Sequence, residues 1–295
     1  RGWRDGVLVV DDNFIGNKRK LKSEILPALI AWMEAKNYPF ILFTETSINL
    51  ADDEELMRLM VRANFVRVFV GIETPNEDSL VECNKFQNKK RDLISAVKKI
   101  QNFGMVVDGG FIVGFDKDPR HIFNSQIDFI QKSGIVAAMV GLLNAPVGTK
   151  LHKRLEKENR LLERITGDNT DGSINFIPKM NMEKLVGGYN RILHTIYKHK
   201  NYYERIKTLV RELKLKHTKR NKRAPFPKPD HLHALKSLIK SMWHIGVREK
   251  GKKHYWNLLG WTLLKHPRAL ALSVTLAIYG VHFRRMAEYY TKIPF

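Results

Sequence analysis

Acidic, polar and glycine residues gather at the ends of five short apolar runs in the first half of this sequence. Carboxylates, hydroxyls and amides can bind the charged and hydroxyl groups of a small ligand, and glycine lets a ligand approach the backbone. The residues concerned are Asp11, Asp12 and Asn13 after 7–10, Thr44, Glu45 and Ser47 after 40–43, Glu73 after 66–70, Gly110 and Gly114 in and after 105–113, and Asn144 after 135–143.

These residues can form one pocket only if the apolar runs are parallel strands. Between the runs the apolar spacing becomes helical, as in the four-residue spacing from Leu21 to Met33. Asp52, with Glu55 three residues later, predicts a capping box, and Gly104 and Gly134 predict helix ends. The alternation indicates an α/β fold with a parallel sheet, whose strands share one rim at their carboxyl ends.

The first candidates also have structural interpretations. Asp11 and Asp12 suit any turn from a strand into a helix. Thr44, Glu45 and Ser47 could cap the helix that follows them. Both interpretations stay open at the level of the sequence.

Glu73 is the strongest candidate, because a carboxylate directly after an apolar strand must be paired or functional if it is buried. Its alternative is an ion pair with an arginine of a neighbouring strand. Gly110 and Gly114 fit a strand that lets a flat ring approach its backbone, although a β-bulge would need them too. Asn144 could present its backbone to a ligand or belong to a plain loop.

Composition narrows the class of protein. The single cysteine, Cys83, cannot form an internal disulfide or supply a metal cluster alone, which favours a reducing, cytoplasmic location. The chain starts at Arg1 without a signal-peptide pattern, and we interpret it as a fragment. From Lys198 onward lie 23 of the 51 Lys and Arg residues but only 5 of the 30 Asp and Glu residues.

Four segments follow from these patterns. Residues 1–156 form the β/α part, and 157–218 form a helical domain that includes a long helical stretch over 182–214 and a polar loop over 166–173. Residues 219–230 read as a basic, proline-rich linker. Residues 231–295 form a basic and apolar helical tail.

Several of these motifs, in this order, resemble the radical SAM superfamily. The similarity is closest to its cobalamin-binding subgroup, which includes hopanoid C-methylases and carries a post-barrel domain of otherwise unknown function. Residues 175–180 and 202–205 match that domain, and Asn159 stands where relatives usually have glycine. The barrel motifs are 11–17 (DDNFIGN), 47–51 (SINLA), 71–75 (GIETP) and 110–116 (GFIVGFD).

The resemblance implies a partial radical SAM barrel that lacks its first strand and cluster-binding loop, followed by a mainly helical C-terminal region. It implies S-adenosylmethionine at the rim, with Asp11 and Asp12 near its methionyl ammonium and Glu73 in contact with the cofactor or the substrate. A 4Fe-4S cluster and cobalamin would be bound by parts outside this chain, and an electron donor would reduce the cluster. The intact enzyme would methylate an unactivated carbon through a 5′-deoxyadenosyl radical, whereas the fragment alone would be inactive.

The tail suggests two different partners. Residues 258–283, with Trp256 and Trp261 near the boundary, suit an interfacial anchor on an anionic membrane, which would help with a lipid or isoprenoid substrate. Its alternative is a helical hairpin that packs on the barrel or on a partner. Basic residues interleaved with Tyr197, Tyr202 and Tyr203 could instead bind nucleic acid, as in an RNA-modifying enzyme. A non-catalytic scaffold is the third interpretation.

Overall fold

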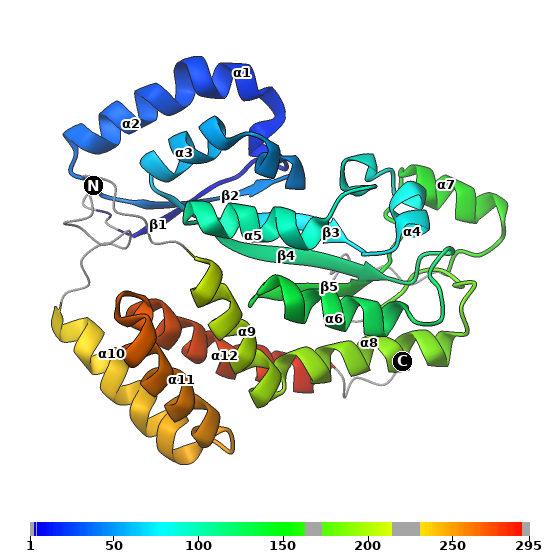
Figure 1. The fold of residues 1–295 in the computed structure, drawn as a ribbon. Coiled ribbons are helices and arrows are strands. Elements are labelled where there is room, and N and C mark those ends of the chain that lie inside the picture. The colour runs from blue at the N-terminus through cyan, green and yellow to red at the C-terminus, as the bar shows by residue number, and fades with distance from the viewer. Residues whose placement is uncertain (1–2, 4, 163–172, 214–230, 291–295) are drawn as a thin grey trace.

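The computed structural model describes residues 3, 5–162, 173–213 and 231–290. Its centre is a parallel sheet in which the strands follow one another in chain order, from β1 to β5 (Figure 1). The predicted α/β fold with a partial barrel is therefore confirmed. The strands are β1 (Gly6–Val9), β2 (Ile41–Thr46), β3 (Phe65–Glu73), β4 (Val106–Val113) and β5 (Ala138–Leu142).

Helices connect the strands and then form the second half of the described chain. The connections are η1 (Phe14–Asn17), α1 (Lys18–Lys20), η2 (Leu21–Ile25), α2 (Leu26–Ala35), η3 (Ile48–Asp52), α3 (Glu54–Arg62), α4 (Glu77–Glu82), η4 (Phe86–Asn88), α5 (Leu93–Phe103) and α6 (Ile122–Ser133). After β5 come α7 (Lys150–Lys157), α8 (Met182–Tyr197), α9 (His199–Glu212), α10 (His231–Trp243), η5 (His244–Arg248), α11 (Lys252–Lys265), η6 (Pro267–Ala269) and α12 (Leu270–Tyr290).

The two faces of the sheet differ in burial. Val68, Val70 and Ile72 of β3 are fully buried, whereas the residues between them are partly exposed. Successive side chains of a strand point to opposite faces, and α3, α5 and α6 pack against the sheet, so the buried face is the helix-covered one. We call the other face the inner face; β3 contributes Arg67, Phe69 and Gly71 to it.

Helix ends follow the sequence in most places. Gly104 and Gly134 adopt left-handed conformations after α5 and α6, as predicted. Asn159 also has a positive φ after α7, which explains why asparagine can stand in a position that favours glycine. The predicted capping residue Asp52 was wrong: Asp53 accepts the hydrogen bond from Leu56 N–H instead.

Asp52 has a different role. Its carboxylate accepts two hydrogen bonds from the Arg91 guanidinium, at 2.7 and 2.6 Å. This bidentate pair joins the end of η3 to the turn before α5.

The helical second half is more divided than the sequence indicated. The stretch predicted over 182–214 is two helices, α8 and α9, which meet at Lys198. The predicted linker 219–230 and most of the polar loop 166–173 lie outside the described residues.

The tail packs as a helical hairpin rather than standing apart as an anchor. Leu258, Leu259, Leu272, Leu276 and Ala277 are buried, because α11 and α12 pack on α8 and α9. In Figure 1, α10, α11 and α12 lie together beside α9, away from α4 and α7. Among the described residues, no helix combines the length and apolar character that crossing a bilayer requires.

Candidate functional site

The ends of the first two strands are joined by predicted rim residues. Asn13 accepts hydrogen bonds through its side-chain oxygen from Ser47 N–H at 3.0 Å and from Ser47 Oγ at 3.1 Å. Both residues follow parallel strands that pair in register, so their proximity follows from the sheet. Asn13 and Ser47 therefore lie together at the rim.

Three other predicted rim residues, Asp11, Asp12 and Asn144, differ in what their side chains contact. Asp11 accepts a hydrogen bond from Asn13 N–H, which is the turn role kept open above, and Asp12 is exposed. Asn144, after β5, donates to the Leu142 and Ser173 carbonyls.

Thr44 and Glu45 lie within β2 rather than after it, so the predicted end of this strand was too early. Thr44 is buried on the helix-covered face and donates to the Val9 carbonyl, which removes it from the site. Glu45 pairs in register with Phe69 and is exposed on the inner face. The alternation of a strand thus separates two adjacent candidates.

Glu73 occupies an unusual backbone position. It ends β3 with a φ of +63°, a left-handed conformation that glutamate rarely adopts. The register between β3 and β4 shifts between Gly71 and Glu73, which marks a β-bulge. Left-handed conformations of ordinary residues concentrate at functional sites, where surrounding structure holds them.

The side chain of Glu73 is paired, though not with an arginine. Its carboxylate lies 2.9 Å from Lys85 Nζ and is mostly buried. A Cβ on Gly71 would come within 2.6 Å of Glu73 Oε1 and 3.0 Å of Lys85 Nζ, so the ion pair lies directly over this glycine. Glu73 therefore projects over the inner face.

Two amide side chains hold the bulge in place. Asn88 donates to the Gly71 and Ile72 carbonyls at 3.2 and 3.0 Å. Gln126 donates to the Ile112 carbonyl at 2.7 Å and to the Glu73 carbonyl at 3.4 Å. These bonds satisfy carbonyls of the bulge and so stabilise the backbone that aims Glu73.

Below Glu73, the inner face presents an aromatic ring over a glycine. A Cβ on Gly110 would lie 3.0 Å from the Phe69 ring, so Phe69 covers this glycine. The close approach at Gly110 is thus made by the Phe69 side chain, and the predicted approach of an adenine ring to this glycine stays a prediction.

A partly buried ion pair closes the lower end of the inner face. Arg67 lies 3.2 Å from Asp108, and its guanidinium stacks on Tyr279 of α12. Burial raises the pKa of Asp108 to about 6, although Arg67 partly offsets this effect. The C-terminal helix thereby contributes to the floor of the site.

Gly114 directly follows β4 and has a φ of +108°. Asp118 accepts hydrogen bonds from Gly114 N–H at 2.8 Å, from Phe115 N–H at 3.1 Å and from Ser79 Oγ at 2.7 Å. Gly114 is thus needed for the turn, which Asp118 closes through its hydrogen bonds. Burial raises the pKa of Asp118 to about 6.

The described residues offer no set of ligands for a metal cluster. No group of three His, Cys, Asp or Glu side chains that could hold a metal ion occurs among them. Burial raises the pKa of the Cys83 thiol to about 11, which disfavours the thiolate that a metal requires. Iron ligands are therefore not found in the described part of the chain.

The tyrosines considered for stacking nucleic-acid bases are not accessible. Tyr197, Tyr202 and Tyr203 are all buried, and the hydroxyls of Tyr197 and Tyr202 donate to the Ala138 and Leu276 carbonyls. The prediction that these tyrosines stack on bases was therefore wrong, because their side chains form the core between α8, α9 and α12.

Comparison with known proteins gives a consistent result. Residues 149–293 match the domain of unknown function DUF4070. The chain is 36% identical over 288 residues to an uncharacterized methyltransferase of Synechocystis sp., and the match covers 97% of this chain and 53% of the relative. It is 35% identical over 176 residues to the hopanoid C-2 methylase of Rhodopseudomonas palustris, which covers 60% of this chain and 33% of the relative.

A third relative extends the group. The chain is 26% identical over 153 residues to the bacteriochlorophyllide d C-12(1)-methyltransferase of Chlorobaculum tepidum, covering 52% of this chain and 33% of that protein. The chain thus spans about half the length of the first relative and a third of the other two.

The half-barrel, its polar rim and these matches confirm the resemblance to the radical SAM group. The chain carries the DUF4070 domain, and part of it is similar to a protein named as a hopanoid C-2 methylase.

Sequence reasoning missed the residues that position Glu73. Lys85, Asn88 and Gln126 lie outside the strand ends, in helices and turns that the β/α repeat folds back toward the rim. For Lys85 and Asn88, the sequence offered one signal. Both lie in the stretch after α4, which is mostly polar and contains few apolar residues.

Proposed function

We propose that this chain is the part of a radical SAM methyltransferase that binds S-adenosylmethionine on the inner face of the half-barrel. The left-handed, bulge-held Glu73 is the observation that carries the proposal, since it places a carboxylate over the inner face at the carboxyl end of the sheet. The relatives named as methyltransferases support the class of reaction.

The chemistry of these residues fits the cofactor. A carboxylate such as Glu73 can accept charge-assisted hydrogen bonds from the methionyl ammonium. Ser47 and Asn13 offer a hydroxyl and an amide at the rim for polar groups such as the ribose hydroxyls. The Phe69 ring over Gly110 offers a flat apolar surface on which an adenine could stack.

The fit does not extend to the metal cofactors. Cys83 is a single thiol whose pKa burial raises to about 11, so the described residues supply no set of thiolates for a 4Fe-4S cluster. The resemblance assigns cobalamin to a separate domain. We place both groups with other parts of the complete protein. When bound there, they would let S-adenosylmethionine act as the source of a radical and of a methyl group for an unactivated carbon.

This chain's own residues would bind, orient and shield the cofactor. The edge of β1 pairs with no further strand among the described residues, and Leu8 and Val10 are exposed beside it. Another element of the complete protein could pair with this edge and close the site against water. The names of two relatives specify carbon positions, which supports methylation at carbon and a large apolar substrate of the lipid or isoprenoid kind.

Binding of S-adenosylmethionine by variants of the complete protein tests the proposal. Glu73→Gln removes the carboxylate and should weaken binding about tenfold, the effect of losing roughly 1.4 kcal/mol. Lys85→Met breaks the same ion pair but leaves the carboxylate free, so it should bind at least as tightly as wild type. Asp78→Asn, exposed on α4, is the matched control.

The two main variants separate a ligand role from a structural one. If Glu73 served only to pair with Lys85, both substitutions would have the same effect on binding. Equal weakening by both, or unchanged affinity in Glu73→Gln, would contradict the proposed site.

A further inference from the structure

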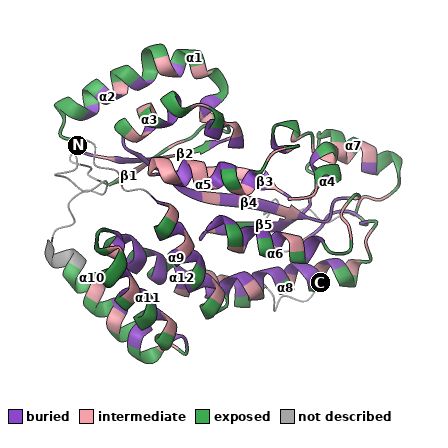
Figure 2. Cartoon of the chain, in the orientation of Figure 1, coloured by how far each residue is buried: buried purple, intermediate pink, exposed green. Residues whose placement is uncertain are grey.

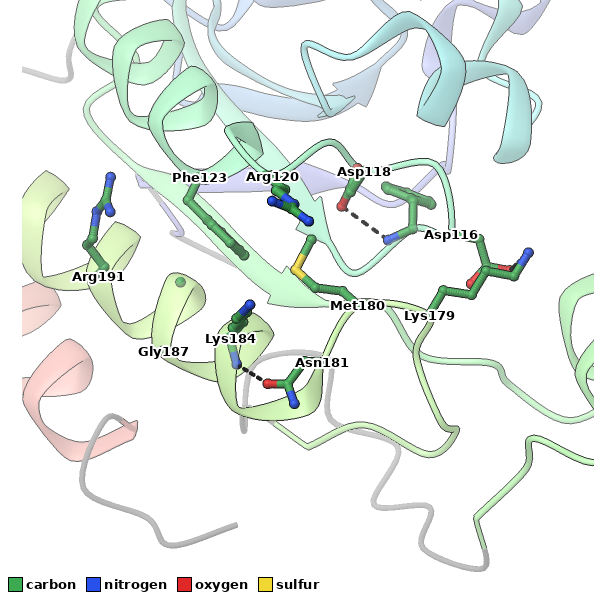
Figure 3. Close-up of a pocket in the computed structure, with 12 residues that line it drawn as sticks. Asp116, Asp118, Arg120, Phe123, Lys179, Met180, Asn181, Lys184, Gly187 and Arg191 are labelled. Carbon is green, nitrogen blue, oxygen red and sulfur yellow. Dashed lines mark hydrogen bonds and ion pairs between the residues drawn. The ribbon is translucent and has the colours of Figure 1, made fainter.

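A pocket lies between α6, α8 and the loop after β4 (Figure 3), and neither Glu73 nor Phe69 of the inner face lines it. Its volume is about 650 Å³, enough for a small organic ligand. Its charged lining includes Arg120 from the loop and Lys184 and Arg191 from α8. None of the functions considered so far uses this pocket.

Helix α8 presents two cations separated by glycines. Lys184, Gly187 and Arg191 recur at spacings of three and four residues, so they share one face of the helix, as Figure 3 shows. Phe123 reaches toward the same face from α6, and a Cβ on Gly188 would come within 2.3 Å of its ring. A Cβ on Gly187 would meet nothing within 4 Å, so the space between the two cations stays open.

The charges of the pocket are unbalanced. Asp116 is bound to Arg160 at 2.7 Å, and Asp118 is bound to Ser79 and two backbone N–H groups, so both carboxylates have partners. Burial opposes ionisation of Asp116, but Arg160, Arg154 and Lys179 outweigh it and hold its pKa below the usual range.

The three lining cations that remain have no ion pair with any residue that the structure describes. They are Arg120, Lys184 and Arg191. Unpaired cations around a concave surface raise the local concentration of anions, and arginine binds phosphate in a bidentate manner. Phe123 and Met180 add apolar surface for the rest of a ligand.

We infer that this pocket binds the phosphate group of a soluble phosphate ester. The inference goes beyond the proposed methyl transfer and does not depend on it. The probe is inorganic pyrophosphate, and its affinity for the complete protein is measured by titration calorimetry. Lys184→Gln and Arg191→Gln should each weaken binding about tenfold, whereas Lys132→Gln, exposed at the other end of α6, should leave it unchanged.

Three results would overturn the inference. They are the absence of saturable pyrophosphate binding, binding that both pocket variants leave intact, and displacement of pyrophosphate by S-adenosylmethionine, which would merge this pocket with the rim site. Vesicles that contain phosphatidic acid test the lipid source of the same group. If the pocket variants lowered vesicle binding, the ligand would be a lipid headgroup and not a soluble ester.

Helix α10 and η5 carry a separate exposed apolar surface. Four large apolar side chains at four-residue spacing are exposed there, and we call them the α10 stripe: Leu235 (53%), Ile239 (57%), Trp243 (55%) and Val247 (48%). Trp256 of α11 extends the stripe, since its indole N–H donates to the Gly246 carbonyl at 2.8 Å. Exposed apolar side chains arranged on one helix face mark a contact surface.

Cations surround the α10 stripe. Residues 231–290 carry 10 Lys and Arg residues against Glu249 and Glu288. Arg248 lies over the Trp243 ring at 5.9 Å. The exposed cations of α10, η5 and the start of α11 form no ion pair with a described residue: Lys236, Lys240, Arg248, Lys250, Lys252 and Lys253.

We propose that the α10 stripe docks on an anionic membrane surface. Apolar side chains would enter the interface while lysine and arginine meet lipid headgroups. The same charges would repel a second copy of this face, so charge complementarity favours an anionic surface. The stripe replaces 258–283 as the proposed contact, because Leu258, Leu259, Leu272 and Leu276 of that segment are buried within the protein, although Leu263 and Leu264 are exposed.

Flotation of the complete protein with vesicles tests this proposal. Vesicles of phosphatidylglycerol and phosphatidylcholine should retain the protein, and phosphatidylcholine alone should not. The double variant Ile239→Ser/Trp243→Ser should reduce retention at least tenfold. The matched control, Phe86→Ser/Val147→Ser, removes two equally exposed apolar side chains elsewhere and should have no effect.

Retention that the stripe variant leaves unchanged, or no retention on anionic vesicles, would overturn the proposal. So would RNA binding without lipid that the substitutions Lys236→Gln and Lys240→Gln abolish.

Discussion

At the scale of single residues, the inner face is built from charges that are only partly paired. Glu73 is paired with Lys85, and Asp108 is paired with Arg67. One oxygen of Asp108 is nevertheless buried without a hydrogen-bond partner among the described residues. A buried carboxylate with an unsatisfied oxygen costs stability when it ionises.

This cost predicts a pH dependence of folding. Because the pKa of Asp108 is raised to about 6, the folded protein binds its proton more tightly than the unfolded chain does. The contribution of Asp108 is therefore complete below about pH 4 and is lost as pH rises through about 6, by about 3 kcal/mol. Asp108→Asn should flatten the free energy of unfolding between pH 4 and 7.

Urea unfolding at several pH values measures the effect. Asp118 keeps its own raised pKa in the variant, so a smaller slope remains. A slope equal to that of wild type would show that Asp108 does not titrate in this range.

At the scale of elements, α8 is the helix that joins the two halves. It packs against α6, β5, α9 and α12, and Figure 2 shows many buried residues along it. Two neighbouring glycines of α8 have different surroundings. Gly188 is buried against the Phe123 ring, whereas Gly187 is exposed. Within one turn of α8, the position of Gly188 has no room for a side chain, whereas the position of Gly187 has room for one.

Alanine substitutions at these neighbours should have opposite effects. Gly188→Ala overpacks the contact with Phe123 and should lower the free energy of unfolding by about 1–3 kcal/mol. Gly187→Ala gains helix propensity at no steric cost and should raise it by up to about 1 kcal/mol. Denaturant unfolding of both variants checks the pair, and changes of equal sign would contradict the packing described.

At the scale of the whole molecule, Arg205 ties the sheet to the helical region. Its guanidinium is fully buried and donates to Gln131 Oε1 at 2.5 Å, to the Val136 carbonyl at 3.3 Å and to the Ile196 carbonyl. It also lies over the rings of Tyr197 and Tyr202. Burial lowers its pKa to about 10, so it remains charged at neutral pH.

Loss of this arginine should weaken the entire fold. Arg205→Met leaves several buried acceptors unsatisfied and should lower the free energy of unfolding by roughly 3–5 kcal/mol. Both halves should then unfold in one transition at lower denaturant concentration. Arg211→Met, on the same helix but exposed, is the control. A variant in which the sheet keeps its stability would show that the halves fold independently.

Much of this architecture could be predicted from sequence periodicity. The five apolar runs became five strands within a few residues, and the glycine helix ends were correct at Gly104 and Gly134. These features depend on local patterns, which a single sequence displays directly.

The details of the site were less accessible, because they depend on contacts between distant segments. Thr44 and Glu45 face opposite sides once β2 extends to Thr46. The bulge at Glu73 is fixed by Asn88 and Gln126 from other elements. Burial of the tail likewise depends on packing between helices far apart in the chain.

The most direct test of the central claim is a crystal structure of the complete protein with S-adenosylmethionine. We expect its ammonium within hydrogen-bonding distance of the Glu73 carboxylate and its adenine near Phe69 and Gly110. Cofactor bound elsewhere, with the Glu73–Lys85 pair and the inner face unoccupied, would contradict the account.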